Sequence, residues 1–313
     1  MNKVVTNGQG VKIEEIDINS TNQRLDNYLL RYLKGVPKSK IYNIIRRGEV
    51  RVNKKRAKPS QKLLTGDLVR VPPVNMAKKI EKIVPDILKE QILAAIVYQD
   101  LQFIVLNKPA GMAVHGGSGL SFGVIEVIRA ALAQPQLELA HRLDKDTSGC
   151  LLIVKQRKAL VDIHHLLRLK KVRKKYLALL AHKWEGPRQR VIDIPLQKST
   201  LVSGERLVQP SEDGKSAKTM FKLVENFEHC CLVAAYPVTG RTHQIRVHAQ
   251  SMGQPIIGDK KYGAKSTSLD ESLQKPERLY LHANQLSFDW QPESHFFDVT
   301  PDEKWQKQMK SRK

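Results

Sequence analysis

The run Cys150–Val154 constrains the fold most, because it is fully apolar and is bounded by Gly149 and Lys155. A run of this length is typical of a strand buried on both faces, although a buried helical segment gives the same pattern. The charged stretch 141–148 comes directly before it. We therefore expect Asp144 on a loop held by a rigid element, where proteins tend to place chemistry.

Asp144 stands between two cations, Arg142 and Lys145. An ionised carboxylate in a positively charged cleft suits nucleophile or base chemistry on a polyanion. The alternative is a structural role, in which Asp144 caps a turn or pairs with Arg142. The second carboxylate of the stretch, Asp146, is assigned to the turn.

The charge of the whole chain indicates a polyanionic partner. Lysine and arginine number 53 against 31 acids, a formal net charge of +22. Nucleic acid is the usual reason for such an excess, through counterion release at phosphates. A membrane surface is the rival, but no amphipathic basic helix, lipidation signal or apolar run of roughly 18 residues stands out. We expect no membrane partner.

Cysteine usage and the first residues favour the cytoplasm. The segment 1–8 lacks the apolar core of a secretion signal. The cysteines, Cys150, Cys230 and Cys231, lie in apolar surroundings at no metal-ligand spacing, and adjacent Cys230 and Cys231 would point to opposite faces of a strand. A reducing compartment fits this pattern. No sequence feature marks an oligomer, and we expect a monomer.

Charge and hydrophobic periodicity divide the chain into parts. We expect an N-terminal extension (1–20), a small RNA-binding domain (21–73), a linker with at most one weak helix (74–94) and a catalytic domain (95–313). The segment from Arg24 to Lys62 holds thirteen lysines and arginines against two acids, Asp26 and Glu49. Helical apolar spacing and strand-like alternation within it predict two short helices, the second capped by Ser39, and a small hairpin.

This basic segment resembles the S4 RNA-binding domain through 24–26, 38–41, 48–55 and 66–67. The resemblance implies contact with structured RNA through the second helix and the strand after it. The residues that it assigns to RNA binding are Lys38, Ser39, Arg46, Arg47, Arg51 and Lys54. A helix N-terminus with added cations offers both dipole and charge to phosphates.

Downstream segments supply further candidates. Basic residues 170–175 lead into Tyr176 at the start of an apolar strand, where its ring can either pack in a core or stack on an unpaired base. After a strand that ends at Pro237, Thr242 is expected to cap a helix in which Arg246 can enter a cleft and pair with a carboxylate. No suitable carboxylate or cysteine accompanies the nearby histidines, so no metal site is expected. We expect His282 to be a hydrogen-bonded structural histidine.

Taken together, 107–109, 141–144, 147–149, 175–176, 239–246 and 281–283 resemble the RluA-type pseudouridine synthases. The resemblance implies an α+β fold, with the S4-like domain followed by a catalytic domain on a mixed, mainly antiparallel sheet. It further implies that Asp144 is catalytic, that Tyr176 lies against the target base and that Arg246 forms the ion pair holding Asp144. Arg142 would help to extrude the nucleotide, and Arg241 and Lys108 would contact the substrate.

Stretches 33–39 and 113–126 resemble the members of that family that act on large-subunit ribosomal RNA. The implied function is isomerisation of specific uridines of 23S ribosomal RNA to pseudouridine, without a cofactor because no redox change or phosphoryl transfer occurs. The alternatives are the same chemistry on other ribosomal or transfer RNA uridines, or a non-catalytic RNA-binding ribosome-assembly factor. Whether Asp144 attacks the sugar or base, or removes a sugar proton, stays open here.

Overall fold

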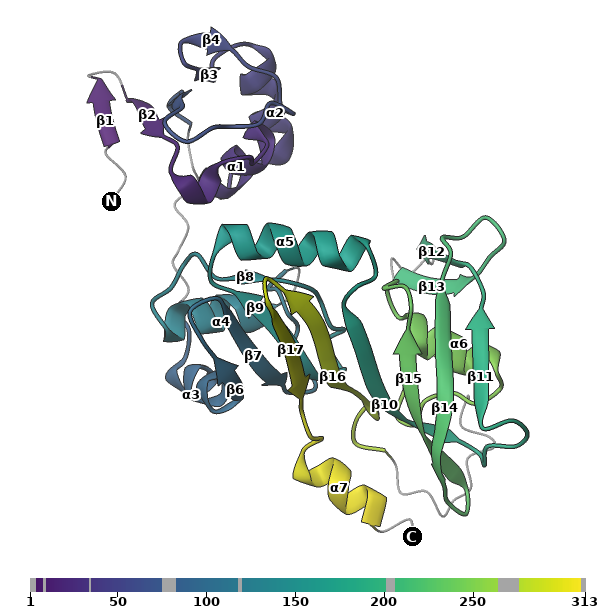
Figure 1. The fold of residues 1–313 in the computed structure, drawn as a ribbon. Coiled ribbons are helices and arrows are strands. Elements are labelled where there is room, and N and C mark those ends of the chain that lie inside the picture. The colour runs from purple at the N-terminus through teal and green to yellow at the C-terminus, as the bar shows by residue number, and fades with distance from the viewer. Residues whose placement is uncertain are drawn as a thin grey trace. The chain divides into compact units, whose positions relative to one another are not determined.

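A computed structural model describes residues 4–7, 10–33, 35–74, 83–117, 120–200, 206–263 and 276–310. The chain divides into two compact units, Met1–Ile83 and Val84–Lys313 (Figure 1). Lys34, residues 75–82 of the expected linker and residues 118–119 of the family-like stretch lie outside the described residues.

The first unit packs two helices on a five-stranded antiparallel sheet with the order β1-β2-β5-β3-β4. Leu29, Ile41, Ile45 and Val69 meet in its core, as the helical spacing predicted. Its elements are β1 (Val4–Asn7), β2 (Val11–Glu15), a 3-10 turn (Ile18–Ser20), α1 (Leu25–Tyr32), α2 (Lys38–Arg46), β3 (Arg51–Val52), β4 (Lys55–Arg56) and β5 (Leu68–Val71).

The segments on both sides of the expected domain take part in the fold, and the expected linker contains the one helix that was allowed for it. The expected extension supplies β1 and β2, because β2 pairs with β5 and Ile16 after it is buried in the core. The expected linker contains α3 (Asp86–Ala94), which packs against α4 (Val124–Ala131) of the second unit and buries Ile92 there. Short alternating segments bury too little apolar surface to be recognised without their partners.

The second unit is built on a ten-stranded sheet with the order β11-β14-β15-β10-β16-β9-β7-β6, to which β17 and β8 add at β16 and β9. The pairing of β9 with β16 is parallel and the other described pairings are antiparallel, so the mixed, mainly antiparallel sheet is confirmed. The strands are β6 (Ile96–Gln99), β7 (Phe103–Lys108), β8 (Glu138–Leu139), β9 (Ser148–Val154), β10 (Arg173–Ala181), β11 (Gln189–Asp193), β14 (Lys218–Asn226), β15 (Cys230–Pro237), β16 (Leu281–Trp290) and β17 (Glu293–Asp298).

Helices cover this sheet, and a small separate ribbon pairs β12 (Leu196–Thr200) with β13 (Arg206–Pro210). The helix α5 (Arg157–Arg168) packs on β9 and β16, and α6 (Gln244–Ser251) packs on β14 and β15 (Figure 1). The last helix is α7 (Glu303–Lys310). All seven residues of β9 are buried, which confirms the predicted two-sided strand.

One row of backbone partners crosses the centre of the sheet. Lys108 pairs with Gly149, Gly149 with Ala283, Ala283 with Tyr176, and Tyr176 with Ala235. At Gly149 (φ +108°), a Cβ would come within 2.2 Å of the Ala283 carbonyl oxygen, so only glycine fits. This row holds the loop before β9, the tyrosine of β10 and the end of β15 together, although they lie far apart in the sequence.

Candidate active site

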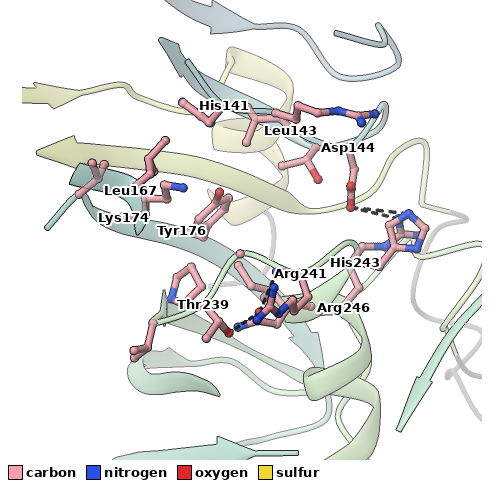
Figure 2. A pocket seen from close by; sticks show the side chains of 18 of the residues that line it. His141, Leu143, Asp144, Leu167, Lys174, Tyr176, Thr239, Arg241, His243 and Arg246 are labelled. Carbon is pink, nitrogen blue, oxygen red and sulfur yellow. Dashed lines mark hydrogen bonds and ion pairs between the residues drawn. The ribbon is translucent and has the colours of Figure 1, made fainter. Parts of the chain in front are cut away.

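A cavity of about 540 Å³ opens where these segments meet, and Asp144, Tyr176 and Arg246 all line it (Figure 2). Asp144 comes from the loop before β9, Tyr176 from β10 and Arg246 from α6. The structure therefore brings together the three residues predicted to carry the chemistry. Asp144 is partly accessible, with 26% of its side chain exposed, as a group that must meet a substrate requires.

Arg246 faces Asp144, but its shortest contacts are with another carboxylate. Its Nε and Nη2 donate to the two carboxylate oxygens of Asp259 at 2.7 and 2.8 Å, whereas Nη1 lies 3.5 Å from Oδ2 of Asp144. The guanidinium also lies over the Tyr262 ring, 5.0 Å from its centroid. The predicted ion pair with Asp144 is present, yet Asp259 is what fixes the arginine.

Burial disfavours the charged forms of both Arg246 and Asp259. Burial lowers the pKa of Arg246, but the hydrogen bonds and charge of Asp259, with the charge of Asp144, raise it overall. Burial likewise raises the pKa of Asp259, and the Arg246 hydrogen bonds and charge outweigh it, so that the net shift is downward. Asp259 also accepts from the backbone N–H groups of Lys261 and Tyr262 at 2.9 and 3.0 Å. The arginine and Asp259 thus stay ionised while Asp144 keeps free lone pairs.

His243 forms a second contact with Asp144, at 3.9 Å from Nε2 to Oδ2. Tyr262 is buried, and its hydroxyl accepts from the Val208 N–H at 3.0 Å and lies 2.8 Å from Nδ1 of His243. The hydroxyl hydrogen is satisfied if it is donated to Nδ1, which places the imidazole hydrogen on Nε2, facing Asp144. Burial lowers the pKa of His243 against the opposing charge of Asp144, so the ring is neutral near pH 7.

The turn that leads into α6 is held by Gln244. Its side-chain oxygen accepts from the Thr239 hydroxyl at 2.7 Å and from the Arg241 backbone N–H at 3.0 Å. The predicted cap is wrong: His243, in the left-handed region at φ +55°, takes the N-cap position instead of Thr242. The predicted end of the preceding strand at Pro237 is confirmed.

Tyr176 and Lys174 lie two residues apart on β10, and both line the cavity. Burial, with the charge of Asp144, raises the pKa of Tyr176, so its hydroxyl keeps its proton. Burial lowers the pKa of Lys174 to about 8. Figure 2 shows Lys174 and Leu167 on the side of Tyr176 that faces away from Asp144.

A second cavity of about 1050 Å³ adjoins the first, and Arg142, Asp144, Arg241, His243 and Arg246 line both. Arg142 and Arg241 are exposed, consistent with the predicted contact to a substrate. The second cavity adds cations that the sequence analysis did not single out: Lys145, Lys198, Lys260, Lys261 and Arg278.

Lys108 is not where the sequence analysis expected it. Its side chain is fully buried and lines neither cavity, and its Nζ donates to the carbonyl oxygens of Pro109, Met112 and Lys145 at 2.7, 2.7 and 3.0 Å. An ammonium group with all three hydrogens used has none left for a substrate. The structure therefore supports a positioning role, since Lys108 ties down the loop that carries Asp144.

In the first unit, the six residues predicted to contact RNA are all exposed: Lys38, Ser39, Arg46, Arg47, Arg51 and Lys54. They lie on α2, on β3 and in the turn after β3. Ser39 is not the helix cap, because α2 already begins at Lys38 after Pro37. Asp26 of the motif 24–26 has a structural role, since it accepts from the Arg24 side chain and the Tyr42 hydroxyl and so joins α1 to α2.

Sequence reasoning missed Asp259, Tyr262 and Lys174, and it weighed His243 only as a metal ligand. The available signal for Asp259 was a lone carboxylate after the apolar turn 255–258, among lysines. The expectation for His282 is confirmed, because both ring nitrogens are hydrogen-bonded, to the Ser148 hydroxyl and the Val299 carbonyl. Within the described ranges, no cluster of histidine, cysteine or acidic residues has the makeup of a metal site, and no helix is long and apolar enough to cross a membrane.

Comparison with known proteins assigns both units. Residues 102–251 match the RNA pseudouridylate synthase family, and residues 23–69 match the S4 domain. Two solved human structures resemble the fold: RNA Pseudouridylate Synthase Domain Containing 4 (TM-score 0.59, 26% identity, covering 70% of this chain and 93% of that one) and Domain Containing 1 (TM-score 0.56, 27% identity, covering 66% and 83%).

Curated relatives extend the match over nearly the whole chain. The chain is 52% identical to Ribosomal large subunit pseudouridine synthase C of Yersinia pestis, covering 91% of this chain and 89% of that protein. It is 51% identical to the protein of the same name from Escherichia coli strain K12, covering 90% of each. These matches confirm the family resemblance seen in the sequence motifs. The chain belongs to the RNA pseudouridylate synthase family.

Proposed function

We propose that this synthase converts uridines of the 23S ribosomal RNA of the large subunit to pseudouridine, with Asp144 as the catalytic carboxylate and no cofactor. The relatives named for the large ribosomal subunit support the substrate. The single observation that carries the chemistry is the partly accessible Asp144, which lines one cavity together with Arg246 and Tyr176.

The geometry suits each step of the isomerisation. The N1–C1′ bond of uridine breaks, the base turns, and the ring rejoins the sugar through C5. An ionised carboxylate can attack the sugar or the base, or remove a sugar proton, and Arg246 supplies a positive charge 3.5 Å away. Tyr176 offers a flat ring on which the freed base stacks while it turns. Its protonated hydroxyl places no second negative charge beside Asp144.

The target uridine must leave its helix to reach this cavity, at a few kcal/mol. Exposed Arg142 at the rim fits the predicted role of extruding the nucleotide or filling the gap that it leaves. Arg241 stands on the same rim, where it donates to the Ser216 carbonyl at 3.0 Å. The exposed basic face of the first unit adds binding free energy from phosphate contacts.

The test pairs two neighbouring carboxylates. Asp144→Asn should lower pseudouridine formation in 23S transcripts by about 10²–10⁴-fold, the scale of a lost acid–base or nucleophilic group, with RNA affinity retained. Asp146→Asn is the matched control: it makes the same change two residues away on an exposed side chain and should leave turnover unchanged. Unchanged product from Asp144→Asn would overturn the assignment.

Mapping pseudouridine in ribosomal and transfer RNA from cells that lack the protein tests the substrate. Loss of pseudouridine from 23S RNA alone supports the proposal, whereas loss from 16S or transfer RNA would assign the enzyme a different substrate. We further propose that the enzyme works as a monomer in the cytoplasm. The three cysteines are buried and unpaired, which fits a reducing compartment. Light scattering of the purified protein checks the oligomeric state.

The RNA-binding role of the first unit has a separate readout. Arg46→Gln with Arg51→Gln should weaken RNA binding and reduce the slope of log affinity against log salt by about 2, one per lost phosphate contact. Turnover at saturating RNA should stay unchanged, because these residues belong to the other unit. An unchanged salt slope would remove this face from the RNA contact.

A further inference from the structure

Lys174 is a half-buried cation that has no counter-charge among the described residues. Within the described part of the chain, its ammonium group makes no hydrogen bond and no ion pair. An ammonium group that has no protein acceptor and is partly withdrawn from water keeps all of its donors for a ligand. Lys174 lines the cavity of Asp144 and Tyr176, so its partner is a group that enters that cavity.

The neighbouring side chains do not offer that partner. His141, beside it, uses Nε2 to accept from the Leu152 N–H at 3.2 Å, which leaves the ring hydrogen on Nδ1. Burial and the Lys174 charge keep this ring neutral by lowering the pKa of His141 to about 3. Leu167, Val172 and Leu281 line the same region and are apolar. The ammonium group therefore lacks an acceptor until a ligand supplies one.

The position of Lys174 indicates which ligand atom it meets. A uridine stacked on Tyr176 with its sugar at Asp144 directs the opposite edge of its ring away from Asp144. In uracil the ring atom opposite N1 is C4, which carries the O4 carbonyl. Figure 2 shows Lys174 on that far side of Tyr176, with its nitrogen turned toward the tyrosine.

We infer that Lys174 reads the target base by donating a hydrogen bond to the O4 carbonyl of the flipped uracil. This inference rests on the proposed function and adds how the site recognises uridine. Cytosine carries an amino donor at the same ring position, and a lysine has donors only. A site built around this hydrogen bond rejects the analogue that cannot accept it, because the buried donor is then left unpaired. Lys174 thus favours uridine over cytidine.

The test combines a substitution of Lys174 with a replacement of the O4 atom that Lys174 is proposed to contact. Lys174→Met keeps the aliphatic stem and removes the donor, and Lys171→Met makes the same charge change on an exposed neighbour that does not line the cavity. Each enzyme acts on 23S transcripts made with uridine or with 4-thiouridine, whose sulfur is a weak acceptor. Comparing enzymes on the same transcript cancels any effect of sulfur on RNA folding.

On uridine RNA, Lys174→Met should lower kcat/KM by about 10–100-fold, the usual range for a hydrogen bond to a charged group, and Lys171→Met by less than about threefold. On 4-thiouridine RNA, the kcat/KM of the wild-type enzyme should fall to the value that Lys174→Met shows on uridine RNA. The kcat/KM of Lys174→Met should be little lower on 4-thiouridine RNA than on uridine RNA. Equal losses for Lys174→Met on both RNAs, or full activity on uridine RNA, would overturn the inference.

Measurements of thermal stability distinguish a role of Lys174 in recognising the base from a role in holding the fold. Because Lys174→Met removes a half-buried charge that has no counter-charge among the described residues, it should raise Tm by about 2–4 °C while it lowers activity. Lys174→Gln, which keeps a neutral donor, should recover part of the activity on uridine RNA. A fall in Tm for both variants would overturn the inference by assigning Lys174 to the fold. A wild-type enzyme that forms no pseudouridine would instead refute the proposed function.

Discussion

Lys108 binds the loop that carries Asp144, whereas Lys174 lines the cavity that Asp144 lines, and burial lowers the pKa of both lysines, to about 7 and about 8. The ammonium group of Lys108 donates to three carbonyl oxygens, including that of Lys145 beside Asp144. The ammonium group of Lys174 has no partner among the described residues. Burial alone therefore does not reveal a lysine's role. The acceptors around it do: a satisfied cation holds the loop, and an unsatisfied one awaits a ligand.

Among the substitutions that test this comparison, Lys108→Met should have the largest effect on stability. The change leaves three partly buried carbonyl groups without their donor, which should lower the free energy of unfolding by about 3 kcal/mol. Turnover should fall as well, because the loop of Asp144 is no longer fixed. Urea unfolding measures the first effect, with Lys158→Met on the exposed face of α5 as the control. A loss below about 1 kcal/mol would mean that water replaces the ammonium group.

Asp259→Asn should have the next largest effect. It removes the negative charge from the bidentate contact with Arg246 but keeps one acceptor oxygen. We expect a loss of about 2 kcal/mol, less than the about 3–5 kcal/mol of breaking a buried pair outright. Turnover should fall by about tenfold, while RNA affinity stays the same, because Arg246 loses its anchor rather than its charge. An equal fall in affinity would place Asp259 in substrate binding instead.

The stability difference between the wild type and Asp259→Asn should depend on pH in a direction that follows from the pKa of Asp259. The pKa of Asp259 is lowered in the folded protein from the ordinary 3.8. A carboxyl with a lowered folded pKa stabilises the fold above its unfolded pKa, and that stability is lost as the pH falls through the folded value. The advantage of the wild type over Asp259→Asn should therefore be full at pH 7 and shrink below about pH 4. Thermal unfolding between pH 3 and 7 measures it.

Local patterns predicted the parts of the site that depend on local sequence. The buried strand β9, the loop position of Asp144 and the placement of Tyr176 on a strand follow from runs of a few residues, although β10 begins at Arg173, three residues before the expected start. The partners of these residues were harder to find. Lys108 meets the carbonyl of Lys145 from 37 positions away, and Arg246 meets Asp259 from 13 positions away. Such pairings depend on strand order and register, which only the folded sheet defines.

Lys174→Met sharpens the comparison with Lys108→Met, because its effect on stability should have the opposite sign. A lysine with a lowered folded pKa destabilises the fold fully below that pKa, and the penalty disappears as the pH rises toward the unfolded value of 10.5. The variant should therefore be more stable than the wild type by about 1 kcal/mol at pH 7, and the gap should close between pH 8 and 10.5. Unfolding at pH 7, 9 and 10 tests this. A gap that widens with pH would contradict it.

The smallest expected effect concerns the hydrogen bonds between His243 and Tyr262. Like the ammonium group of Lys108, Nδ1 of His243 has a protein partner. Tyr262→Phe removes the hydroxyl between the Val208 N–H and Nδ1 of His243, at a cost below about 1 kcal/mol because the neighbouring cavity admits water. Without that donor, the imidazole hydrogen is free to move to Nδ1, and Nε2 no longer always presents a donor to Asp144. Nitrogen-15 NMR of labelled histidine should show the Nε2–H form in the wild type and a mixture of forms in the variant. A pure Nε2–H form in both proteins would mean that Asp144, 3.9 Å away, sets the tautomer without help from Tyr262.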